Sequence, residues 1–232
     1  SGGGRCHVMF DSGINRLGIG PEQMSQCDLR SMDIDLLLSH LASADEDNAQ
    51  NNAQQRLFHE QAAASAAKRL SLANSAGIML GADYHYDLTR PGLSLYGGIA
   101  RPGMEAFIKP VARLSARLLQ VRTLAAGTSI GYNATHVCRD VTTVGTISIG
   151  YADGYLRAFS GKGRAHHGAV AMPVLGRVSM DLVTIDISAA PELHEGGWVD
   201  VDYDLPTASA LTGLSQYELL TNLGARFERI WR

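Results

Sequence analysis

The chain changes character near residue 110, and this change constrains its fold more than any other feature of the sequence. Before that point, short apolar runs alternate with segments of helical periodicity, which is the pattern of strand–helix units. After it, the segments are rich in Val, Ile and Thr and are broken by Gly or Pro, as antiparallel strands often are. We therefore predict an α/β domain over 1–109 and an antiparallel all-β domain over 110–232.

The first domain carries four apolar runs that we interpret as strands. Runs such as "DIDLLLSH" are apolar almost throughout, which indicates strands buried on both faces of a parallel sheet. Four open strands leave two unpaired edges, whereas a closed (β/α)8 barrel needs eight strands. The domain is therefore either a small open sheet or one half of a barrel. The predicted strands lie in 6–13, 33–40, 69–75 and 86–92, and the predicted helices in 21–30, in 50–70 and shortly after Ser75.

The second domain contains strand-like segments separated by turns, and it ends in a short predicted helix over 215–227. We interpret the glycine-rich "GKGRAHHGA" (161–169), with its adjacent His166 and His167, as a loop and not as a metal site. The predicted strand segments are 110–124, 142–154, 169–188 and 198–205.

Charge and composition exclude several classes of protein. The net charge of −3 carries no basic excess of the kind that nucleic-acid binding requires. No apolar run approaches the roughly 18 residues of a transmembrane helix, and the start "SGGGRCHVMF" lacks the pattern of a signal peptide. The three scattered cysteines form no CxxC pair and support neither a disulfide framework nor a zinc site. We predict a cytoplasmic protein without a nucleic-acid, membrane or metal partner.

Seven short motifs are spread over almost the whole chain. They are "FDSGINRLG" (10–18), "SHLASADE" (39–46), "LANSAG" (72–77), "RPGLSLYG" (90–97), "SIGYNAT" (129–135), "IGYADGYLR" (149–157) and "GRVSMD" (176–181). Each motif alone is weak, but together, in this order and spacing, they resemble those of the alanine racemases, which are fold-type III enzymes that use pyridoxal 5′-phosphate (PLP).

The resemblance implies a fold, a reaction and an assembly. The fold would be the C-terminal half of a PLP (β/α)8 barrel, beginning at its fifth strand, followed by an antiparallel β domain. The reaction would be the interconversion of L-alanine and D-alanine, which supplies D-alanine for peptidoglycan in bacteria. The family works as a head-to-tail homodimer with shared active sites.

Arg90, directly before Pro91 and Gly92, resembles the arginine that donates to the PLP pyridine nitrogen. A guanidinium does not give up its proton, so the ring would stay unprotonated and act as a weaker electron sink. That property suits proton exchange and discourages transamination. The alternative is a surface arginine at a strand end, because charged groups are costly to bury.

The resemblance assigns the phosphate of PLP to Asn74, Ser75 and the backbone of Gly92 and Leu93. Both segments follow predicted strands and lead into helical turns, where backbone N–H groups and the helix dipole favour an anion. The alternative for Asn74 and Ser75 is an ordinary helix cap.

His40 and Arg16 complete the implied cofactor site. His40 resembles the histidine that packs on the PLP ring, although a lone histidine is more often structural. Arg16 resembles the arginine near the PLP phenolic oxygen, which also meets the substrate carboxylate. Its alternative is a solvated arginine in a turn.

Tyr132 resembles the tyrosine that acts as one of the two catalytic bases. Racemisation needs one group on each face of Cα, one to remove a proton and one to return it. In the family, the partner subunit supplies this tyrosine, and hydrogen bonds through a histidine and an arginine favour its phenolate; here these would be His40 and Arg90. The alternative for Tyr132 is a core or interface aromatic.

Met180 matches the position whose backbone N–H contacts the substrate carboxylate. Tyr151, with Arg157 and Arg177, resembles the residues of a narrow entrance that favours a small amino acid. Met180 and the neighbouring Asp181 are alternatively packing residues of the β domain.

Three positions depart from the family pattern. The lysine that forms a Schiff base with PLP lies early in the family, and none of Lys68, Lys109 and Lys162 stands in such a motif. We therefore expect an absent N-terminal piece of roughly 125 residues, half a barrel, and an inactive chain without it. Met9 replaces a lysine that orients the arginine in many members, and Ala225 replaces a tyrosine that helps bind phosphate in some.

Other functions remain open on the sequence alone. One is a racemase of broader specificity, for lysine, arginine or serine, on the same scaffold. A PLP-dependent decarboxylase would place an acid where Arg90 stands, and PLP-carrier barrel proteins lack a long β domain. A non-catalytic binding or assembly fragment would explain the absent lysine.

Overall fold

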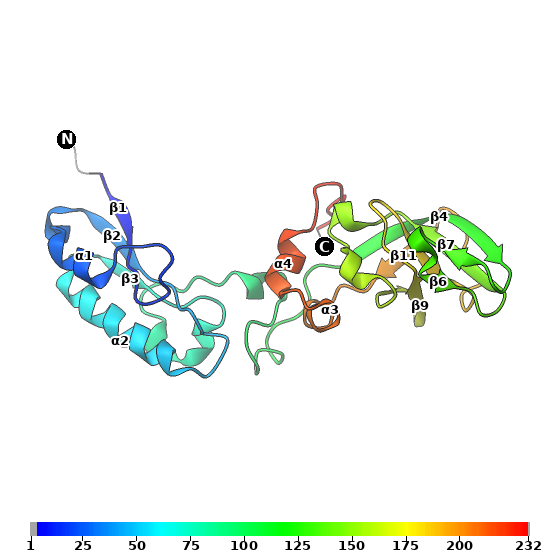
Figure 1. The fold of residues 1–232 in the computed structure, drawn as a ribbon. Helices are drawn as coiled ribbons and strands as arrows, with labels where there is room; N and C mark the ends of the chain where they lie inside the picture. The colour runs from blue at the N-terminus through cyan, green and yellow to red at the C-terminus, as the bar shows by residue number, and fades with distance from the viewer. Residues whose placement is uncertain (1–3, 232) are drawn as a thin grey trace. The chain divides into compact units, whose positions relative to one another are not determined.

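The computed structural model describes residues 4–231, and the chain divides into two units, Ser1–Lys109 and Pro110–Arg232 (Figure 1). The first unit is built on a parallel sheet, and the second is built on an antiparallel barrel. Each unit has its own buried apolar core.

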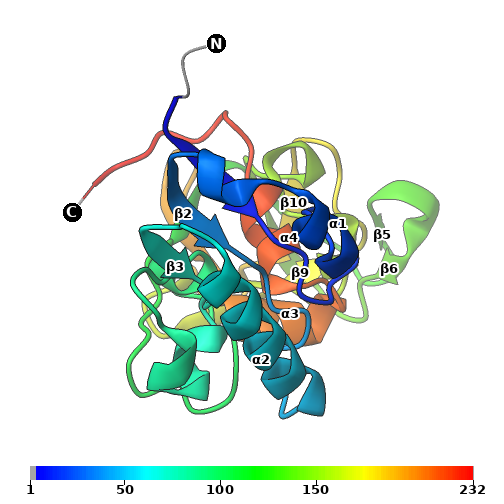
Figure 2. The same cartoon turned by 90° about the vertical axis from the view of Figure 1, so that its left-hand side faces the viewer.

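The first unit contains a three-stranded parallel sheet in the order β1-β2-β3. Helix α2 runs alongside the sheet (Figure 2). It begins where Asn48 accepts a hydrogen bond from the N–H of Gln50. Its Phe58 is fully buried in the apolar core of this unit. Helix α1 starts at Pro21, as predicted, because proline suits the first helical turn. The bounds are β1 Cys6–Met9, α1 Pro21–Gln26, β2 Ile34–Leu38, α2 Ala49–Ala64 and β3 Arg69–Ser71.

The predicted fourth strand is wrong. Over 86–92, only an isolated parallel bridge between Asn74 and Arg90 is present, and the N–H of Arg90 donates to the carbonyl of Ala73 at 2.8 Å. Pro91 has no N–H to donate, so a ladder cannot continue past Arg90. The predicted helix after Ser75 is likewise replaced by two 3₁₀ turns, Gly77–Leu80 and Ala82–Tyr84.

The second unit is a closed six-stranded barrel in the order β10-β7-β4-β11-β8-β9, and all its ladders are antiparallel. Closure removes the exposed edges of an open sheet. A separate two-stranded ribbon, β5-β6, extends from it. The bounds are β4 Leu114–Leu124, β5 Ser129–Ile130, β6 His136–Val137, β7 Thr142–Ile147, β8 Arg164–His167, β9 Val170–Leu175, β10 Val183–Asp186, β11 Trp198–Val201, α3 Leu205–Thr212 and α4 Gln216–Thr221.

The predicted loop around His166 and His167 is also wrong. Both residues lie in β8, which forms a hairpin with β9 through Gly168 at φ +57°. His166 Nε2 lies 2.9 Å from an Asp202 oxygen, and His167 Nε2 lies 3.6 Å from a Glu192 oxygen. Pairing with β9 and β11 overrides the local glycine content.

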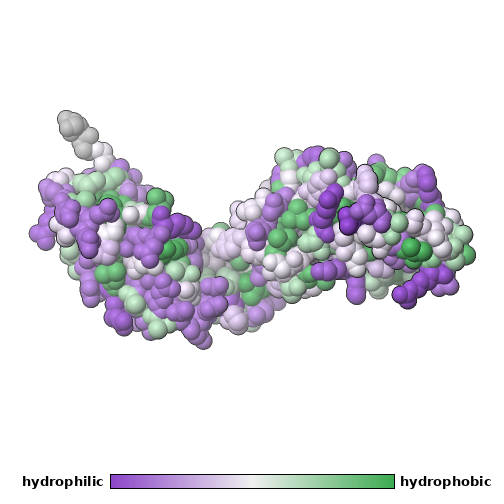
Figure 3. Space-filling view, in the orientation of Figure 1, coloured by the Kyte–Doolittle hydropathy of each residue, from purple (hydrophilic) through white to green (hydrophobic). Residues whose placement is uncertain are grey.

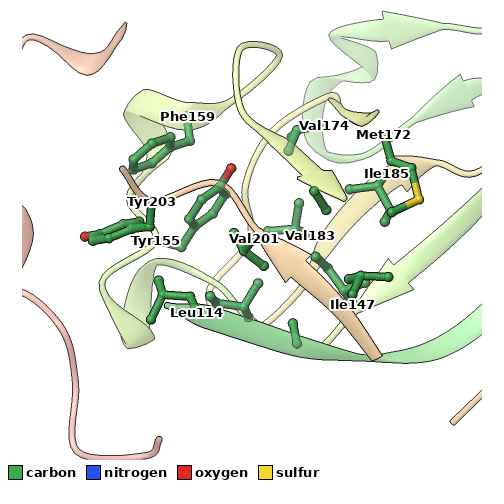
Figure 4. Close-up of a cluster of buried hydrophobic side chains, with 14 of the residues drawn as sticks. Leu114, Ile147, Tyr155, Phe159, Met172, Val174, Val183, Ile185, Val201 and Tyr203 are labelled. Carbon is green, nitrogen blue, oxygen red and sulfur yellow. The ribbon is translucent and has the colours of Figure 1, made fainter. Parts of the chain in front are cut away.

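Apolar side chains fill the barrel in the alternating pattern of half-buried strands. In β4, Leu114, Ala116 and Leu118 are buried, and the residues between them are exposed. Tyr155 stacks on Phe159 with ring centroids 4.3 Å apart at one end of this core (Figure 4). The core fixes the ends of the strands, and the candidate site residues of this unit lie on the loops that these ends carry.

On the face drawn in Figure 3, polar and apolar residues are interspersed on both units. Within residues 4–231, no helix combines the length and the apolar character that a membrane crossing requires.

Candidate active site

The candidate residues of the first unit gather where its parallel strands end. His40 follows β2, Asn74 and Ser75 follow β3, and the bridge to Asn74 brings Arg90 beside them. In α/β folds with parallel strands, ligands bind at this edge, outside the carboxyl ends of the strands.

Arg90 is held in one orientation by neutral acceptors. Its Nη1 donates to Ser71 Oγ at 2.5 Å, and its Nη2 donates to the Ser39 carbonyl at 2.5 Å. Ser71 Oγ in turn donates to the carbonyl of Leu88 at 2.6 Å. Among the described residues no carboxylate pairs with Arg90, and burial lowers the pKa of its guanidinium. The result is an oriented positive charge without a counter-ion, which suits an anion or a ring-nitrogen acceptor.

His40 is only partly exposed, and it lies near two positive charges. Burial lowers the pKa of its imidazole, and the charges of Arg90 and Arg16 lower it further. The ring is therefore neutral near pH 7, which suits packing against a flat aromatic group. In the part of the chain that the structure describes, Arg90 donates to Ser39, Ser71 and Leu72, and it makes no hydrogen bond with His40.

A buried polar cluster supports these residues, and sequence reasoning missed it. Ser12 Oγ and Ser39 Oγ are 2.7 Å apart, and Gln54 Nε2 of α2 donates to Ser12 Oγ at 3.2 Å and to the His40 carbonyl at 3.0 Å. Ser12, Ser39 and Gln54 are each less than 5% exposed. Buried polar groups need partners, so this cluster fixes the loops that carry Arg16 and His40. The only sequence signal is a serine directly after an apolar run.

The two predicted phosphate-binding segments lie together. Ser75 Oγ accepts hydrogen bonds from the N–H groups of Gly92 at 2.9 Å and Ser94 at 3.3 Å. Leu93 is buried and begins the 3₁₀ turn Leu93–Tyr96. Asn74 Oδ1 accepts from the N–H of Gly77 at 2.8 Å, which is the capping role considered as its alternative. Ser75 Oγ, Asn74 Oδ1 and the N–H groups that donate to them form a small cradle at the amino end of the turn Leu93–Tyr96.

Arg16 lies in a turn that Asp11 organises. The Asp11 carboxylate accepts hydrogen bonds from the N–H groups of 13–16 at 2.9–3.0 Å. Burial raises the pKa of Asp11, but these four hydrogen bonds lower it more, so the net direction is down. The side chain of Arg16 is exposed, and the residue is held through its backbone N–H. The Asp11 carboxylate therefore fixes this turn in a chain that has Met9 where many family members have an arginine-orienting lysine.

The lysines of the chain do not enter this cluster. Lys68 precedes β3, and its Nζ donates to Asp33 Oδ1 at 2.6 Å, at the edge where the strands begin. Lys109 is exposed at the end of the first unit, and Lys162 of the second unit donates to the Leu211 carbonyl at 3.4 Å.

The candidate residues of the second unit are exposed on loops. Tyr132 is 65% exposed and lies in the 3₁₀ turn Tyr132–Ala134 between β5 and β6. Asn133 and Ala134 have positive φ values of 62° and 48°, which are costly for an alanine. Strained backbone of this kind often accompanies functional residues.

Tyr151 and Met180 lie on adjacent loops of the second unit. The N–H of Tyr151 donates to the Ser179 carbonyl, and the N–H of Ala152 donates to the Met180 carbonyl, both at 3.0 Å. The Arg157 guanidinium lies 5.0 Å from the centroid of the Tyr151 ring. The backbone N–H of Met180 itself makes no hydrogen bond within residues 4–231, so it remains a donor for a ligand.

Comparisons with known proteins match both units. The family profile for the alanine racemase N-terminal domain covers residues 2–100, and the profile for the alanine racemase C-terminal domain covers residues 111–231. A catabolic alanine racemase of Agrobacterium fabrum is 40% identical over 96% of this chain and 60% of its own length. An alanine racemase of Cereibacter sphaeroides is 39% identical over 98% of this chain and 65% of its own length.

A solved structure extends the likeness to the fold. The alanine racemase of Bartonella henselae, with covalently bound pyridoxal phosphate, superposes with a TM-score of 0.88 at 33% identity. The match covers 97% of this chain and 66% of that one. The chain therefore spans about 60–66% of the length of these relatives. Both units are matched in order, by one profile up to residue 100 and by the other from residue 111, and the chain belongs to the alanine racemase family.

Proposed function

We propose that this chain is the larger part of a PLP-dependent racemase that interconverts L-alanine and D-alanine. The first unit would be the second half of a (β/α)8 barrel that holds PLP, and the second unit would supply the substrate-facing loops. The enzyme would act as a homodimer in the cytoplasm and provide D-alanine for peptidoglycan.

The observation that carries this proposal is the environment of Arg90. An oriented guanidinium without a carboxylate partner lies beside a neutral His40 and next to the Ser75–Gly92 cradle. Ser94 Oγ, at the same cradle, is buried and has no partner among the described residues. The guanidinium and the neutral imidazole fit the ring nitrogen and the ring face of PLP, and the unpartnered Ser94 hydroxyl fits a donor to its phosphate.

When bound, PLP supplies the electron sink that weakens the Cα–H bond of an amino acid. Arg90 would donate to the ring nitrogen and, because it keeps its proton, would leave that nitrogen unprotonated. His40 would lie against the ring face. Arg16 would meet the phenolic oxygen and the substrate carboxylate. The phosphate would be bound by Asn74, Ser75, Gly92 and Leu93.

The residues of the second unit would handle the substrate. Tyr132 would move the proton on one face of Cα. Met180 would donate its backbone N–H to the substrate carboxylate, and Tyr151 with Arg157 would narrow the entrance in favour of a small side chain. A lysine outside this sequence would hold the PLP aldehyde and act on the other face, because Lys68 lies at the opposite edge of the sheet.

The proposal is tested by the racemisation of L-alanine with added PLP. We expect no turnover by the 232-residue chain alone and turnover when the N-terminal part of a related racemase is added in trans. In the reconstituted enzyme, Tyr132→Phe should lower kcat by about 10²–10⁴-fold. Tyr217→Phe, a change at another exposed tyrosine, should leave it unchanged.

Three outcomes would contradict this proposal. Turnover by the chain alone would refute the inference that the lysine lies outside it. No alanine turnover after reconstitution, with activity on lysine, arginine or serine, would favour the broader racemase. PLP binding without any turnover would favour a non-catalytic role.

A further inference from the structure

The C-terminal segment of the second unit reaches back to the loops that carry Tyr151 and Met180. Arg226 Nε donates to Asp153 Oδ1, and Arg226 Nη1 donates to Asp181 Oδ1, both at 2.7 Å. Asp153 lies in the same 3₁₀ turn as Tyr151, and Asp181 directly follows Met180. One guanidinium thus joins the two substrate-facing loops.

The Arg226–Asp153 pair differs on one side from an exposed ion pair, which contributes little to stability: the Arg226 side chain is 53% exposed, but the carboxylate that it meets is buried. The Asp153 side chain is only 9% exposed, and its second oxygen accepts a hydrogen bond from the N–H of Gly150 at 3.0 Å. The N–H of Gly224 also donates to the Asp153 carbonyl at 3.0 Å. A buried carboxylate needs a fixed counter-charge, and the structure provides Arg226 for it.

The two loops also fit closely, so the position of one determines the position of the other. A Cβ on Gly150 would lie 2.3 Å from the Met180 carbonyl oxygen, so the backbones meet without room for a side chain. Hydrogen bonds from Tyr151 and Ala152 to the carbonyls of 179 and 180 complete this contact. A change in the Asp153 turn is therefore passed to the N–H of Met180.

We propose that Arg226 is a positioning residue that holds the Tyr151 and Met180 loops in register for an amino-acid carboxylate. This inference rests on the proposed function for its substrate. Arg226 stands next to Ala225, where some relatives have a phosphate-binding tyrosine, and its role here is to support the substrate side of the site. It touches no reacting atom itself.

Amide exchange tests the geometric part without any need for activity. In Arg226→Ala, the amides of Tyr151 and Ala152 should exchange about tenfold faster or more, because the pairing that restrains their loop is lost. Arg229→Ala is the matched control, since within residues 4–231 Arg229 donates only to the Gly224 carbonyl, at 3.3 Å. In Arg229→Ala, the amides of Tyr151 and Ala152 should exchange at the wild-type rate. The amides of β10, which serve as an internal reference, should exchange at the wild-type rate in both variants.

A second variant guards against loss of the fold in Arg226→Ala. Asp181→Asn keeps the Asp153–Arg226 pair, whose carboxylate is buried, and weakens only the Arg226–Asp181 pair, in which both side chains are about half exposed. It should accelerate exchange at Ala152, whose N–H donates to Met180, with an unchanged melting temperature. Exchange within about twofold of wild type in every folded variant would overturn the proposal.

Kinetics in the reconstituted enzyme test the functional part. Arg226→Ala should raise KM for alanine by about fivefold or more with a smaller change in kcat, and Arg226→Lys should recover part of this loss. A fall in kcat at unchanged KM would overturn the assignment to substrate positioning. If wild type does not racemise alanine, the proposed function fails, whereas the exchange result still decides whether Arg226 fixes the loops.

Discussion

The two units hold their candidate site residues in opposite ways. In the first unit, Ser39, Ser71 and Ser75 are at most 1% exposed, and side-chain hydrogen bonds fix the groups around Arg90. In the second unit, Tyr132 is 65% exposed and Met180 is 53% exposed. Their loops are held by backbone contacts and, beside Met180, by the ion pair of Arg226 with Asp181. Burial and shifted pKa values therefore reveal the first set of residues, whereas the contacts of their loops reveal the second.

Gly150→Ala should have the largest effect on stability, because the added methyl group would disrupt the close backbone contact between Gly150 and Met180 in the second unit. The φ of Gly150 is −160°, which any residue adopts, so the only obstacle is space. Its Cβ would lie 2.5 Å or less from the carbonyl carbon and oxygen of Met180, and we expect a loss of about 3 kcal/mol in the free energy of unfolding. Urea denaturation followed by tryptophan fluorescence measures this loss, since Trp198 and Trp231 both lie in the second unit.

Gly168→Ala is the control for Gly150→Ala, because it introduces backbone strain without steric crowding. Gly168 has φ +57° and no heavy atom within 4 Å of an added Cβ. We expect it to cost about 1 kcal/mol from strain alone. Equal losses in the two variants would show that close packing of the Met180 loop does not hold this half of the site.

Ser71→Ala should have the next largest effect on stability, because it removes side-chain hydrogen bonds around Arg90 in the first unit. The substitution removes the acceptor for Arg90 Nη1 and the donor to the Leu88 carbonyl. We expect a loss of about 2 kcal/mol, since one of these bonds involves a charged group. Amide exchange of Leu36 and Leu37 in β2 reports the stability of this unit, which contains no tryptophan. Ser25→Ala, at an exposed serine of α1, should change little.

Sequence reasoning predicted those elements whose causes are local. Asn48 and Pro21 start their helices through contacts within a few residues, and the alternation in β4 is visible in its own segment. The predicted strand at 86–92 failed because Arg90 is held by one bridge rather than by a ladder. The predicted loop at His166 failed because β8 pairs with the distant strand β11 as well as with the neighbouring strand β9.

The candidate site divides in the same way. The motif order led to Arg90 and Ser75, but it carried no information on what orients them. Ser71 lies 19 positions from Arg90, and Asp153 lies 73 positions from Arg226. A single sequence contains no signal for such long-range partners, because each is an unremarkable serine, aspartate or arginine until the fold brings them together.

A smaller effect should appear in the pH dependence of the first unit. The folded pKa of His40 lies below its ordinary value of 6.5, so between these two pKa values the unfolded chain binds a proton that the folded chain does not. The free energy of unfolding therefore falls as pH drops through about 6.5. His40→Gln should remove this part of the slope between about pH 7.5 and pH 5.5, by less than about 1 kcal/mol since the group is only partly buried.

Amide exchange of β2 at several pH values, corrected for the intrinsic exchange rate, measures this slope. His59→Gln, at an exposed histidine of α2, is the matched control and should keep the wild-type slope. A wild-type slope in His40→Gln would show that the imidazole titrates as it does in the unfolded chain. Folding of the first unit would then leave His40 as accessible to solvent as the exposed site residues of the second unit.

The smallest expected effect is that of Ala134→Gly, beside Tyr132. Alanine at φ 48° carries a strain of about 1–2 kcal/mol, and glycine removes this strain while losing about 0.5–1 kcal/mol to chain entropy. We expect a net stabilisation of about 0.5 kcal/mol in urea denaturation. Ala169→Gly, where φ is not positive, should show the opposite sign. If the strain serves to present Tyr132, the reconstituted enzyme should lose activity severalfold as it gains stability. A more stable and equally active variant would instead mean that the exposed loop positions Tyr132 without the help of strain.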